Sequence, residues 1–239
     1  MKKAIVTGGT RGIGLAIASM LLEEGYFVTV TYAHDDESAD RCRQKFSAFP
    51  DRFEIVKADN ADKMQMSAFT AKMRQKGHID CLVCNAGTTL RKNLPDISDD
   101  EWESVLHVNL SSKVFLVRDL IPVIPDGSRI VFIASMMGIY PHSTSIAYGV
   151  SKAAIIALAE NMVKLFEGTG TTVNAVAPGF VDTDWQKDKE EGHSRRICEK
   201  IALGRFAEPK EIAEAVRFCV RNAYVNGSVI QVSGGYSYK

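Results

Sequence analysis

The 239-residue sequence has no excess of either charge, because 29 Lys and Arg residues are balanced by 29 Asp and Glu residues. The lack of a basic field argues against a nucleic-acid-binding protein, and no polybasic segment is present to bind a membrane surface. No apolar run approaches the roughly 20 residues that a membrane span requires. The apolar stretch near the N-terminus is too short for a signal peptide. We therefore expect a cytoplasmic protein with no nucleic-acid or membrane partner.

Cysteine is scarce, and its five positions do not fit a disulfide framework, which needs an even number. Cys81 and Cys84 match the C-x-x-C pattern, but they lie inside an apolar run that indicates a buried strand. Residues three apart on a strand point to opposite faces, so the two thiols should not meet. No second Cys or His pair at zinc spacing accompanies them. We interpret these cysteines as buried apolar side chains and expect no metal site.

Short apolar runs alternate with longer amphipathic segments along the chain. The runs with the length of buried strands are 4–7, 27–32, 53–58, 81–84, 129–134, 173–177 and 229–232. The helices predicted between them are 12–24, 37–48, 64–76, 101–120, 147–166 and 210–220. This alternation predicts right-handed βαβ units and a parallel sheet with helices on both faces. We therefore expect one doubly wound, Rossmann-like α/β domain over residues 1–239.

A charged segment at 182–204 interrupts the alternation of strands and helices. A solvated surface helix would explain most of its charges. Trp185 and the place of the segment after the sixth predicted strand favour a substrate lid, because ligands in such folds bind beyond the carboxyl ends of the strands. We predict a lid over about 182–204 and keep the surface helix as the alternative.

A glycine-rich turn, Thr7-Gly-Gly-Thr-Arg-Gly-Ile-Gly14, follows the first predicted strand and opens the first helix. Glycines allow a tight turn and let the backbone approach a pyrophosphate, which the free N–H groups of the helix N-terminus would bind. The spacing is G-x-x-x-G-x-G rather than G-x-G-x-x-G. Packing of helix against strand would also explain it. Its position between strand and helix favours a dinucleotide site.

This turn resembles that of the short-chain dehydrogenase/reductase family, and the resemblance extends over nearly the whole chain. The N-A-G motif of the family matches residues 85–87, after the fourth predicted strand, and its catalytic Asn matches Asn109. Ser135 ends the fifth strand, and thirteen residues later Tyr148 and Lys152 form the Y-x-x-x-K motif. Further matches are Pro178-Gly179 with Thr183, and the glycine-rich end of the last strand at 225–235.

The resemblance implies a nicotinamide-dependent oxidoreductase with Asn109, Ser135, Tyr148 and Lys152 as catalytic residues. It implies that Lys152 also holds the nicotinamide ribose, that Asn109 keeps a water in a proton relay, and that the protein is a homotetramer. The cofactor-binding residues expected from the turn and the matched motifs are Gly8, Thr10, Arg11, Gly12, Ile13, Gly14, Tyr32, His34, Asp59, Asn60, Asn85, Ala86, Gly87, Tyr148, Lys152, Pro178, Gly179, Val181 and Thr183.

Tyr148 and Lys152 are four residues apart on a predicted helix, so they share a face. A tyrosine with its ordinary pKa near 10 is too weak an acid to exchange protons readily at neutral pH. A cation about 5 Å away is worth roughly 3 kcal/mol at an effective dielectric near 20, which corresponds to about two pKa units. We therefore expect Lys152 to lower the Tyr148 pKa, so that Tyr148 can protonate a carbonyl oxygen while Ser135 binds that oxygen.

Arg11 favours NADPH over NADH as the cofactor. NAD-preferring proteins carry an acid at the end of the second strand, and this position falls at or near Tyr32. Arg11 matches the base that NADP-preferring relatives place on the 2′-phosphate, and an arginine fork suits a phosphate. His34 is a second candidate. The acidic run 35–37 would repel a phosphate if it turned inward, but we interpret it as a solvated turn.

Within the family, the sequence most resembles bacterial 3-oxoacyl-(acyl-carrier-protein) reductases, at 109–112, 174–183 and 204–213. Those enzymes recruit an acidic carrier protein with basic residues before the fifth strand and after the helix that bears the tyrosine. Here 124–129 holds one arginine and one acid, and 166–171 holds no base. We expect a carbonyl compound or an acyl thioester as the substrate, and leave the carrier protein open as a partner.

Two other functions remain open at this point. The first is a sugar, steroid or other secondary-alcohol dehydrogenase on the same scaffold. The second is a nucleotide-sensing regulator that binds the cofactor without turnover. The intact set of Asn109, Ser135, Tyr148 and Lys152 argues against the regulator, because a sensor needs no proton relay.

Overall fold

A computed structural model describes residues 1–141, 145–184 and 191–238 of the chain. Seven parallel strands form one sheet, in the order β3 (Phe53–Lys57), β2 (Phe27–Tyr32), β1 (Lys3–Val6), β4 (Cys81–Cys84), β5 (Arg129–Ile133), β6 (Thr172–Pro178) and β7 (Val229–Val232). The strand order reverses between β1 and β4. Ligands in doubly wound sheets bind at this reversal, beyond the carboxyl ends of the strands. The predicted fold class is confirmed.

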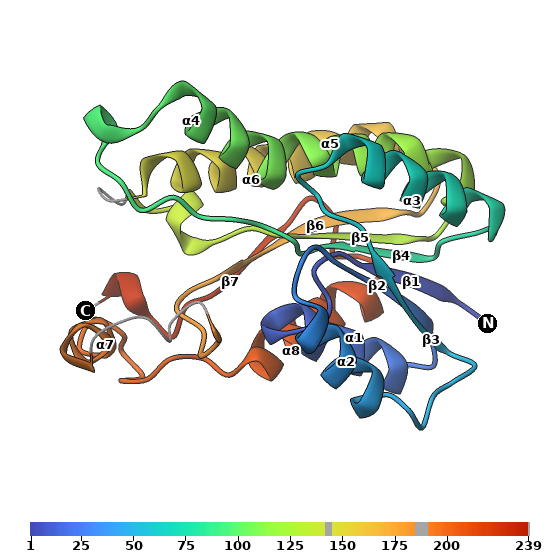
Figure 1. Ribbon diagram of the computed structural model, residues 1–239, viewed down its shortest axis with the longest axis horizontal. Helices are drawn as coiled ribbons and strands as arrows, with labels where there is room; N and C mark the ends of the chain where they lie inside the picture. Colours follow the sequence, from blue (N-terminus) through green and yellow to red (C-terminus); the bar gives the residue numbers. More distant parts are fainter. Residues whose placement is uncertain (142–144, 185–190, 239) are drawn as a thin grey trace.

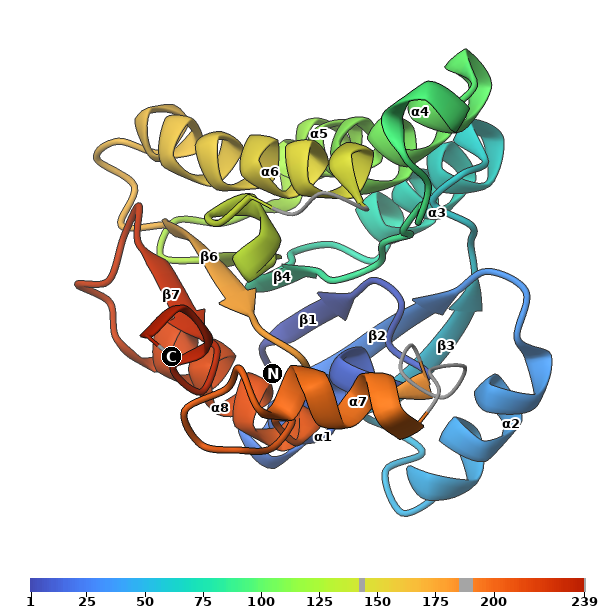
Figure 2. The same ribbon diagram turned by 90° about the vertical axis from the view of Figure 1, so that its left-hand side faces the viewer.

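Helices cover both faces of the sheet (Figures 1 and 2). One face carries α1 (Gly12–Glu23), α2 (Asp36–Lys45) and α8 (Pro209–Arg221), and the other carries α3 (Lys63–Gln75), α5 (Ser112–Leu120) and α6 (Ile146–Leu165). The sheet separates two apolar cores, since Val6 packs with Ile17 and Val216, whereas Ile5 packs with Leu116. Alternate residues of a strand point to opposite faces, so β1 contributes to both cores.

The two cysteines of the C-x-x-C pattern follow the same alternation. Cys81 belongs to the core under α1, and Cys84 belongs to the core under α5 and α6. Both thiols are free and buried. The prediction that they lie on opposite faces of a strand is therefore confirmed.

The helix predicted over 101–120 is interrupted in the structure. It begins earlier, at α4 (Asp99–Leu106), because Ser98 and Glu101 form a capping box. A π-helical turn at His107–Ser111 then separates α4 from α5. Such single wide turns insert one residue into a helix and occur frequently at functional sites. Asn109 lies in the middle of this turn.

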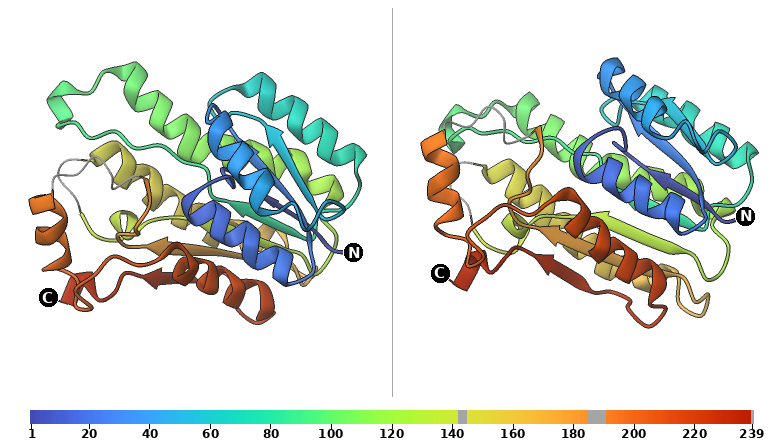
Figure 3. Two further views of the ribbon diagram at one scale, coloured as in Figure 1. Left: turned by 60° about the horizontal axis from the view of Figure 1, so that its bottom comes forward. Right: turned by 90° about the horizontal axis from the view of Figure 1, so that it is seen from below.

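By length and composition alone, α6 would pass as a membrane span. In the structure it packs against β5, β6 and the cores beneath them, with Ile155 and Ala159 fully buried. This single apolar helix is therefore explained as a core element of the fold. A shorter helix, α7 (Glu191–Cys198), lies beside the C-terminus (Figures 1 and 3).

Candidate active site

The glycine turn between β1 and α1 is held in a shape that only glycine permits. Gly8 and Gly12 have positive φ angles of 63° and 53°. A Cβ atom on Gly14 would lie 2.1 Å from the carbonyl oxygen of Gly8. The first turn of α1 therefore packs directly against the glycine turn. No side chain caps the N-terminus of α1, whose N–H groups are the anion site that a pyrophosphate needs.

Asn85, which follows β4, and Thr7, which follows β1, hold the glycine turn in place through hydrogen bonds. The Asn85 Nδ2 group donates to the carbonyl oxygens of Thr7 and Gly8, both at 3.0 Å. The Thr7 Oγ1 atom accepts from the backbone N–H groups of Asn85 and Ala86, each at 3.0 Å. Thr7 is fully buried, and the sequence analysis missed its role. A threonine that ends the first strand directly before the turn was the only available signal.

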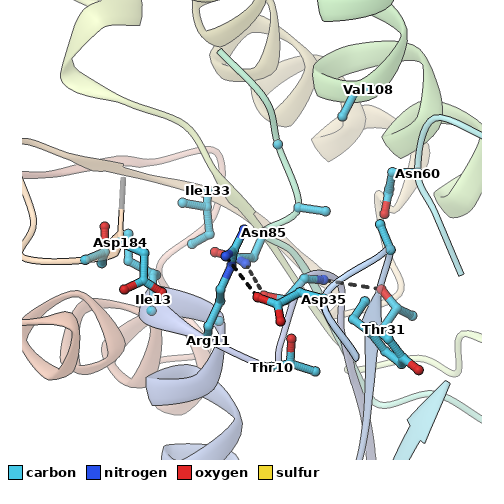
Figure 4. A pocket seen from close by; sticks show the side chains of 18 of the residues that line it. Thr10, Arg11, Ile13, Thr31, Asp35, Asn60, Asn85, Val108, Ile133 and Asp184 are labelled. Atoms are coloured by element: carbon cyan, nitrogen blue, oxygen red, sulfur yellow. Dashed lines mark hydrogen bonds and ion pairs between the residues drawn. The ribbon is translucent and has the colours of Figure 1, made fainter. Parts of the chain in front are cut away.

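A cleft of about 370 Å³ runs along the carboxyl ends of the strands. Every residue predicted to bind the cofactor lines it, as does Ser135. The lining residues that the sequence analysis missed are Thr31, Ala33, Asp35, Ala58, Val108, Ile133, Ala134 and Asp184. Most of them lie at the end of a strand or directly after one. Those residues could have been predicted by taking every residue at a strand end as a candidate. Several are labelled in Figure 4.

One end of the cleft carries an ion pair and a contact between a histidine and a carboxylate. Arg11 faces Asp35 at 3.1 Å, and the two side chains point toward one another in Figure 4. His34 lies 2.9 Å from Asp59. Hydrogen bonds from Ser38, with a smaller contribution from the Arg11 charge, hold the pKa of Asp35 below its usual value.

The solvated-turn interpretation of residues 35–37 is wrong for Asp35. Its side chain lines the cleft, because it also caps the N-terminus of α2 by accepting the N–H of Ser38. The other two acids do face away: Asp36 pairs with Lys57, and Glu37 pairs with Arg41. A carboxylate therefore stands beside the arginine that was predicted to bind a phosphate.

Ser135 and Tyr148 meet at the other end of the cleft. Ser135 follows β5 and caps a short 3₁₀ turn at Met136–Gly138, and its side chain is hydrogen-bonded to Tyr148. Gly138 lets this turn approach α6 closely, since a Cβ atom there would lie 2.6 Å from the backbone of Lys152. The close packing of the turn on α6 sets the position of the serine relative to the tyrosine.

Lys152 lies behind Tyr148 in the buried floor of the cleft. Its Nζ atom donates to the carbonyl oxygen of Ile133 at 2.8 Å and lies 5.4 Å from the centre of the Tyr148 ring. Burial lowers the pKa of Lys152 well below its usual value, and the nearby Lys113 lowers it further.

The expectation that Lys152 lowers the Tyr148 pKa is wrong for this structure. Burial raises the pKa of Tyr148 to about 12, and the hydrogen bond with Ser135 only partly opposes this rise. Lys152 is not among the causes of this shift. Tyr148 therefore holds its proton at neutral pH and is a weaker acid than an ordinary tyrosine, so its role as the proton donor stays a prediction.

Asn109 connects the loop after β4 to α6. Its Oδ1 atom accepts the N–H of Thr88 at 2.8 Å, and its Nδ2 atom donates to the Thr88 carbonyl and to Ser151 Oγ, both at 2.9 Å. Both amide hydrogens are thus used in holding backbone and helix together. Asn109 is fully buried and lies behind the cleft rather than in its lining. The water that the resemblance assigns to it stays a prediction.

Two residues of the chain between Ser135 and Tyr148 lie close to the cleft in sequence but do not line it. Tyr140 donates to Gln231 at 3.3 Å, and Met136 is buried. Trp185, on which the predicted lid partly rests, lies outside the described residues. No group of three His, Cys, Asp or Glu residues able to hold a metal occurs in the described parts of the chain.

The cleft fits a dinucleotide. Its glycine turn offers a bare backbone and a free helix N-terminus to a pyrophosphate, and its far end offers a serine, a tyrosine and a lysine. The short chain dehydrogenase family model matches residues 2–194. The chain belongs to the short-chain dehydrogenase family.

Relatives of this short-chain dehydrogenase match it along nearly their whole length. The 3-oxoacyl-(acyl-carrier-protein) reductase of Staphylococcus epidermidis is 32% identical over 98% of both chains. The reductase of the same name from Thermotoga maritima is 31% identical over 98% of this chain and 97% of its own. The predicted resemblance to these reductases is confirmed.

Solved structures of similar fold include two with a bound nicotinamide cofactor. A blue fluorescent protein from a metagenomic library, in complex with NADPH, superposes with a TM-score of 0.92 at 30% identity, over 99% of this chain and 98% of its own. A short-chain dehydrogenase from Burkholderia cenocepacia, in complex with NADP, gives a TM-score of 0.91 at 29% identity and the same coverage. This short-chain dehydrogenase is an oxidoreductase that uses a nicotinamide cofactor.

Proposed function

We propose that this short-chain dehydrogenase reduces a carbonyl to a secondary alcohol with NADPH, and that a 3-oxoacyl thioester is its first candidate substrate. The observation that carries this proposal is the meeting of Ser135, Tyr148 and Lys152 at one end of a cleft whose other end holds Arg11. The names of the curated relatives support the thioester. A substrate screen distinguishes this proposal from two alternatives. These are a sugar, steroid or other alcohol as the substrate, and a regulator without turnover.

The residues of the cleft have separate parts in this proposal. Bound NADPH supplies the hydride. Ser135 hydrogen-bonds the substrate oxygen, and Tyr148 donates the proton that the oxygen gains. Lys152 holds the nicotinamide ribose, and its positive charge stabilises the Tyr148 phenolate left after proton transfer. Asn109 keeps the loop after β4 and the π-helical turn next to Lys152.

Arg11 supports NADPH as the preferred cofactor, because its guanidinium lies on the cleft and half of its side chain is exposed to solvent. Its partner Asp35 is also exposed enough to turn away or to accept hydroxyl hydrogens. The proposal is that a 2′-phosphate replaces the Asp35 carboxylate as the partner of Arg11.

We propose an acyl thioester, rather than an acyl carrier protein, as the ligand of this site. Arg129 is the one base in the segment before β5, and its guanidinium donates to the carbonyl oxygens of Gly127, Ser128, Gly170 and Val220. It is therefore engaged within the fold and is a poor anchor for an acidic partner.

The segment 182–204 is proposed as a lid within a single domain. Both of its ends are fixed beside the cleft, since Asp182 donates its N–H to Ala207 at 2.8 Å, and Ala207 donates to Phe180 at 2.9 Å. Protection of this segment from limited proteolysis by NADPH would support a lid, and unchanged cleavage would contradict it.

A homotetramer in the cytoplasm completes the proposal. Two neighbouring helices on one face expose apolar side chains: Phe115 on α5 is 37% exposed, and Val150 on α6 is 46% exposed. Such side chains are typical of an interface between copies of a chain.

The deciding experiment measures the loss of absorbance of reduced nicotinamide in the presence of an acetoacetyl thioester and a panel of ketones, sugars and steroids. We expect turnover with NADPH and the thioester. Turnover with another class of compound but not with the thioester would instead indicate a sugar, steroid or other secondary-alcohol dehydrogenase. Cofactor binding with no turnover on the whole panel would favour the regulator and contradict the proposal.

A substitution of Tyr148 tests the assigned chemistry directly. We expect Tyr148→Phe to bind NADPH with nearly unchanged affinity and to lose nearly all turnover, because the ring remains and the proton donor is removed. Titration of cofactor fluorescence and steady-state kinetics measure the two effects. Normal turnover in this variant would remove the phenol from the mechanism.

A further inference from the structure

Lys113 is a fully buried lysine that the proposed mechanism does not use. It lies in the first turn of α5 and is the largest side chain among the fully buried residues. Lysine is almost never fully buried unless an acid pairs with it. Among the described residues no carboxylate interacts with Lys113, and its partners are backbone carbonyl oxygens. A cation in this position requires an explanation other than a salt bridge.

The two carbonyl groups that Lys113 binds belong to the two segments that form the floor of the site. Its Nζ atom donates to the oxygen of Ala86 at 2.5 Å and to the oxygen of Val108 at 3.2 Å. Ala86 lies in the turn after β4, and Val108 lies in the π-helical turn. Both residues line the cofactor cleft. Lys113 therefore connects the two segments from behind, on the side away from the cleft.

The connection lies close to Lys152. A Cβ atom on Gly87 would lie 3.1 Å from Asn109 Oδ1 and 3.7 Å from Lys152 Nζ. The turn after β4, the π-helical turn and Lys152 thus converge at Gly87, one residue from the carbonyl that Lys113 holds. A shift of either segment would change the surroundings of the Lys152 ammonium group.

The charge of Lys113 also acts on the site. Burial lowers the pKa of Lys113 to about 8, and Cys84 on β4 acts in the opposite direction. After burial, the charge of Lys113 is the cause that lowers the pKa of Lys152. Cys84 and Lys152 are the titratable groups that interact with Lys113 within the described chain. The protonation of one lysine therefore opposes that of the other.

We propose that Lys113 is a positioning residue for proton transfer, which holds the Ala86 and Val108 carbonyls together behind the cleft and so fixes the segments next to Lys152. This inference rests on the proposed function, because it assigns a role within the same site. An ammonium group without an ionic partner is costly to bury, so stability alone does not explain a lysine at this position. Its two hydrogen bonds to the floor of the site supply another explanation.

The test compares Lys113→Met, which keeps the length of the side chain but removes the donor and the charge, with Lys113→Gln, which keeps a donor without charge. Lys72→Met, at an exposed position on α3, is the control for kcat and its pH dependence. It also loses the ion pair with Glu54, so the melting temperature of Lys113→Met is compared with the wild-type protein instead. We expect Lys113→Met to keep or raise the melting temperature and to lower kcat about tenfold or more, with KM for the carbonyl substrate changed less. Lys113→Gln should recover part of kcat.

The pH profile separates positioning from a purely structural role. Without the positive charge of Lys113, Lys152 should keep its proton to higher pH, so the limb of the kcat profile that reports Lys152 should move upward in both Lys113 variants. Lys72→Met should keep the profile of the wild-type protein. Wild-type kcat and pH dependence in Lys113→Met would overturn the inference.

Two measurements do not depend on turnover and keep the inference separate from the proposed function. Carbon-13 NMR of lysine follows the titration of Lys152, and hydrogen exchange follows the Thr88 amide, which Asn109 protects. We expect a higher Lys152 pKa and faster exchange in Lys113→Met. If the wild-type protein reduced no carbonyl, the proposed function would fail, and these two readouts would still decide the role of Lys113. No change in either would overturn it.

Discussion

At the scale of single residues, Arg11 and Asp35 are the pair that we propose to set the preference of the cleft between NADPH and NADH. Their side chains pair at 3.1 Å at the end of the cleft that the glycine turn begins. A 2′-phosphate would have to separate this pair and then lie near the Asp35 carboxylate. The two residues therefore act in opposite directions on NADPH, and substitutions at each should show it.

We expect Arg11→Ala to weaken NADPH about tenfold more than NADH, and Asp35→Asn to strengthen NADPH relative to NADH, because like charges repel. Asparagine also caps helices, so α2 should keep its N-terminus. Asp62→Asn is the matched control, since Asp62 caps α3 without lining the cleft. Isothermal titration with both cofactors measures the ratio. Equal losses for both cofactors in Arg11→Ala would contradict the assignment.

Gly138 gives a second prediction at this scale. An added methyl group would meet the backbone of Lys152 and Ala153 at 2.6 to 2.8 Å, and no flexible side chain can yield there. Gly138→Ala should push Ser135 away from Tyr148 and lower kcat on the order of a hundredfold. It should also lower the melting temperature, with cofactor affinity changed less. A wild-type kcat in Gly138→Ala would show that the close packing of the turn on α6 does not set the position of Ser135.

Among single residues, the sequence predicted which residues line the cleft better than it predicted their ion pairs and pKa values. Arg11, Ser135 and Tyr148 could be placed because each follows a strand end or lies at helical spacing from a partner. The inward turn of Asp35 could not be predicted, because a capping acid and a solvated acid have the same local sequence. The rise of the Tyr148 pKa depends on burial by distant segments. Lys113 likewise has the sequence of an ordinary helix-surface residue.

At the scale of elements, Glu54 connects β3 to α3. Lys72 of α3 and Lys76, which follows the last residue of α3, both pair with it, and its side chain is 23% exposed. Burial alone would raise the pKa of Glu54, but the hydrogen bonds from Lys76 and Lys72 outweigh burial and lower it. A carboxyl group whose pKa is lower in the folded protein stabilises the fold above its unfolded pKa, and this stabilisation is lost as the pH falls through the folded pKa.

We therefore expect Glu54→Gln to lower the free energy of unfolding by about 1 kcal/mol at pH 7, with a smaller difference from the wild-type protein below about pH 4. Urea denaturation at the two pH values measures it. Glu167→Gln is the control, because Glu167 is exposed and pairs only with Lys164 across the surface. A difference from the wild type that is independent of pH would show that the ion pairs do not stabilise the packing of α3.

The pattern of apolar residues along the sequence predicted some elements of the structure and missed others. Apolar runs and glycine positions predicted the strands and the turn after β1, because buried parallel strands need such runs. The π-helical turn was missed, since one inserted residue barely alters an apolar pattern over twenty positions. Its position at Asn109 is explained only by tertiary bonds, from Asn109 to Thr88 and Ser151, and from Lys113 to Val108.

At the scale of the whole molecule, the exposed apolar side chains of α5 and α6 predict contact between copies of the chain. We expect Val150→Asp to convert the proposed tetramer into smaller species, because a buried unpaired carboxylate is costly at an interface. Light scattering after size-exclusion chromatography measures the mass. Lys164→Asp, a more exposed position on the same helix, is the control. A wild-type protein that elutes as a monomer would contradict the assembly.

The overall topology could be predicted from the sequence, because strand and helix lengths, short connections and right-handed crossovers leave few alternatives. The placement of the segment 182–204 could not be predicted, since its charges fit both a solvated helix and a lid. The structure adds that its two ends meet: Val181 and Ala207 form an isolated parallel bridge beside the cleft.

That bridge joins the two flanks of the segment by backbone bonds alone. Ile197 and Ile201 are buried, so the later part of the segment belongs to the fixed part of the fold. We expect the part before Ile197 to tolerate changes of length or composition, because long surface loops accept insertions at small entropic cost. If this part is the proposed lid, relatives can differ in the size of substrate they accept by changes here alone, while Ser135, Tyr148 and Lys152 stay the same.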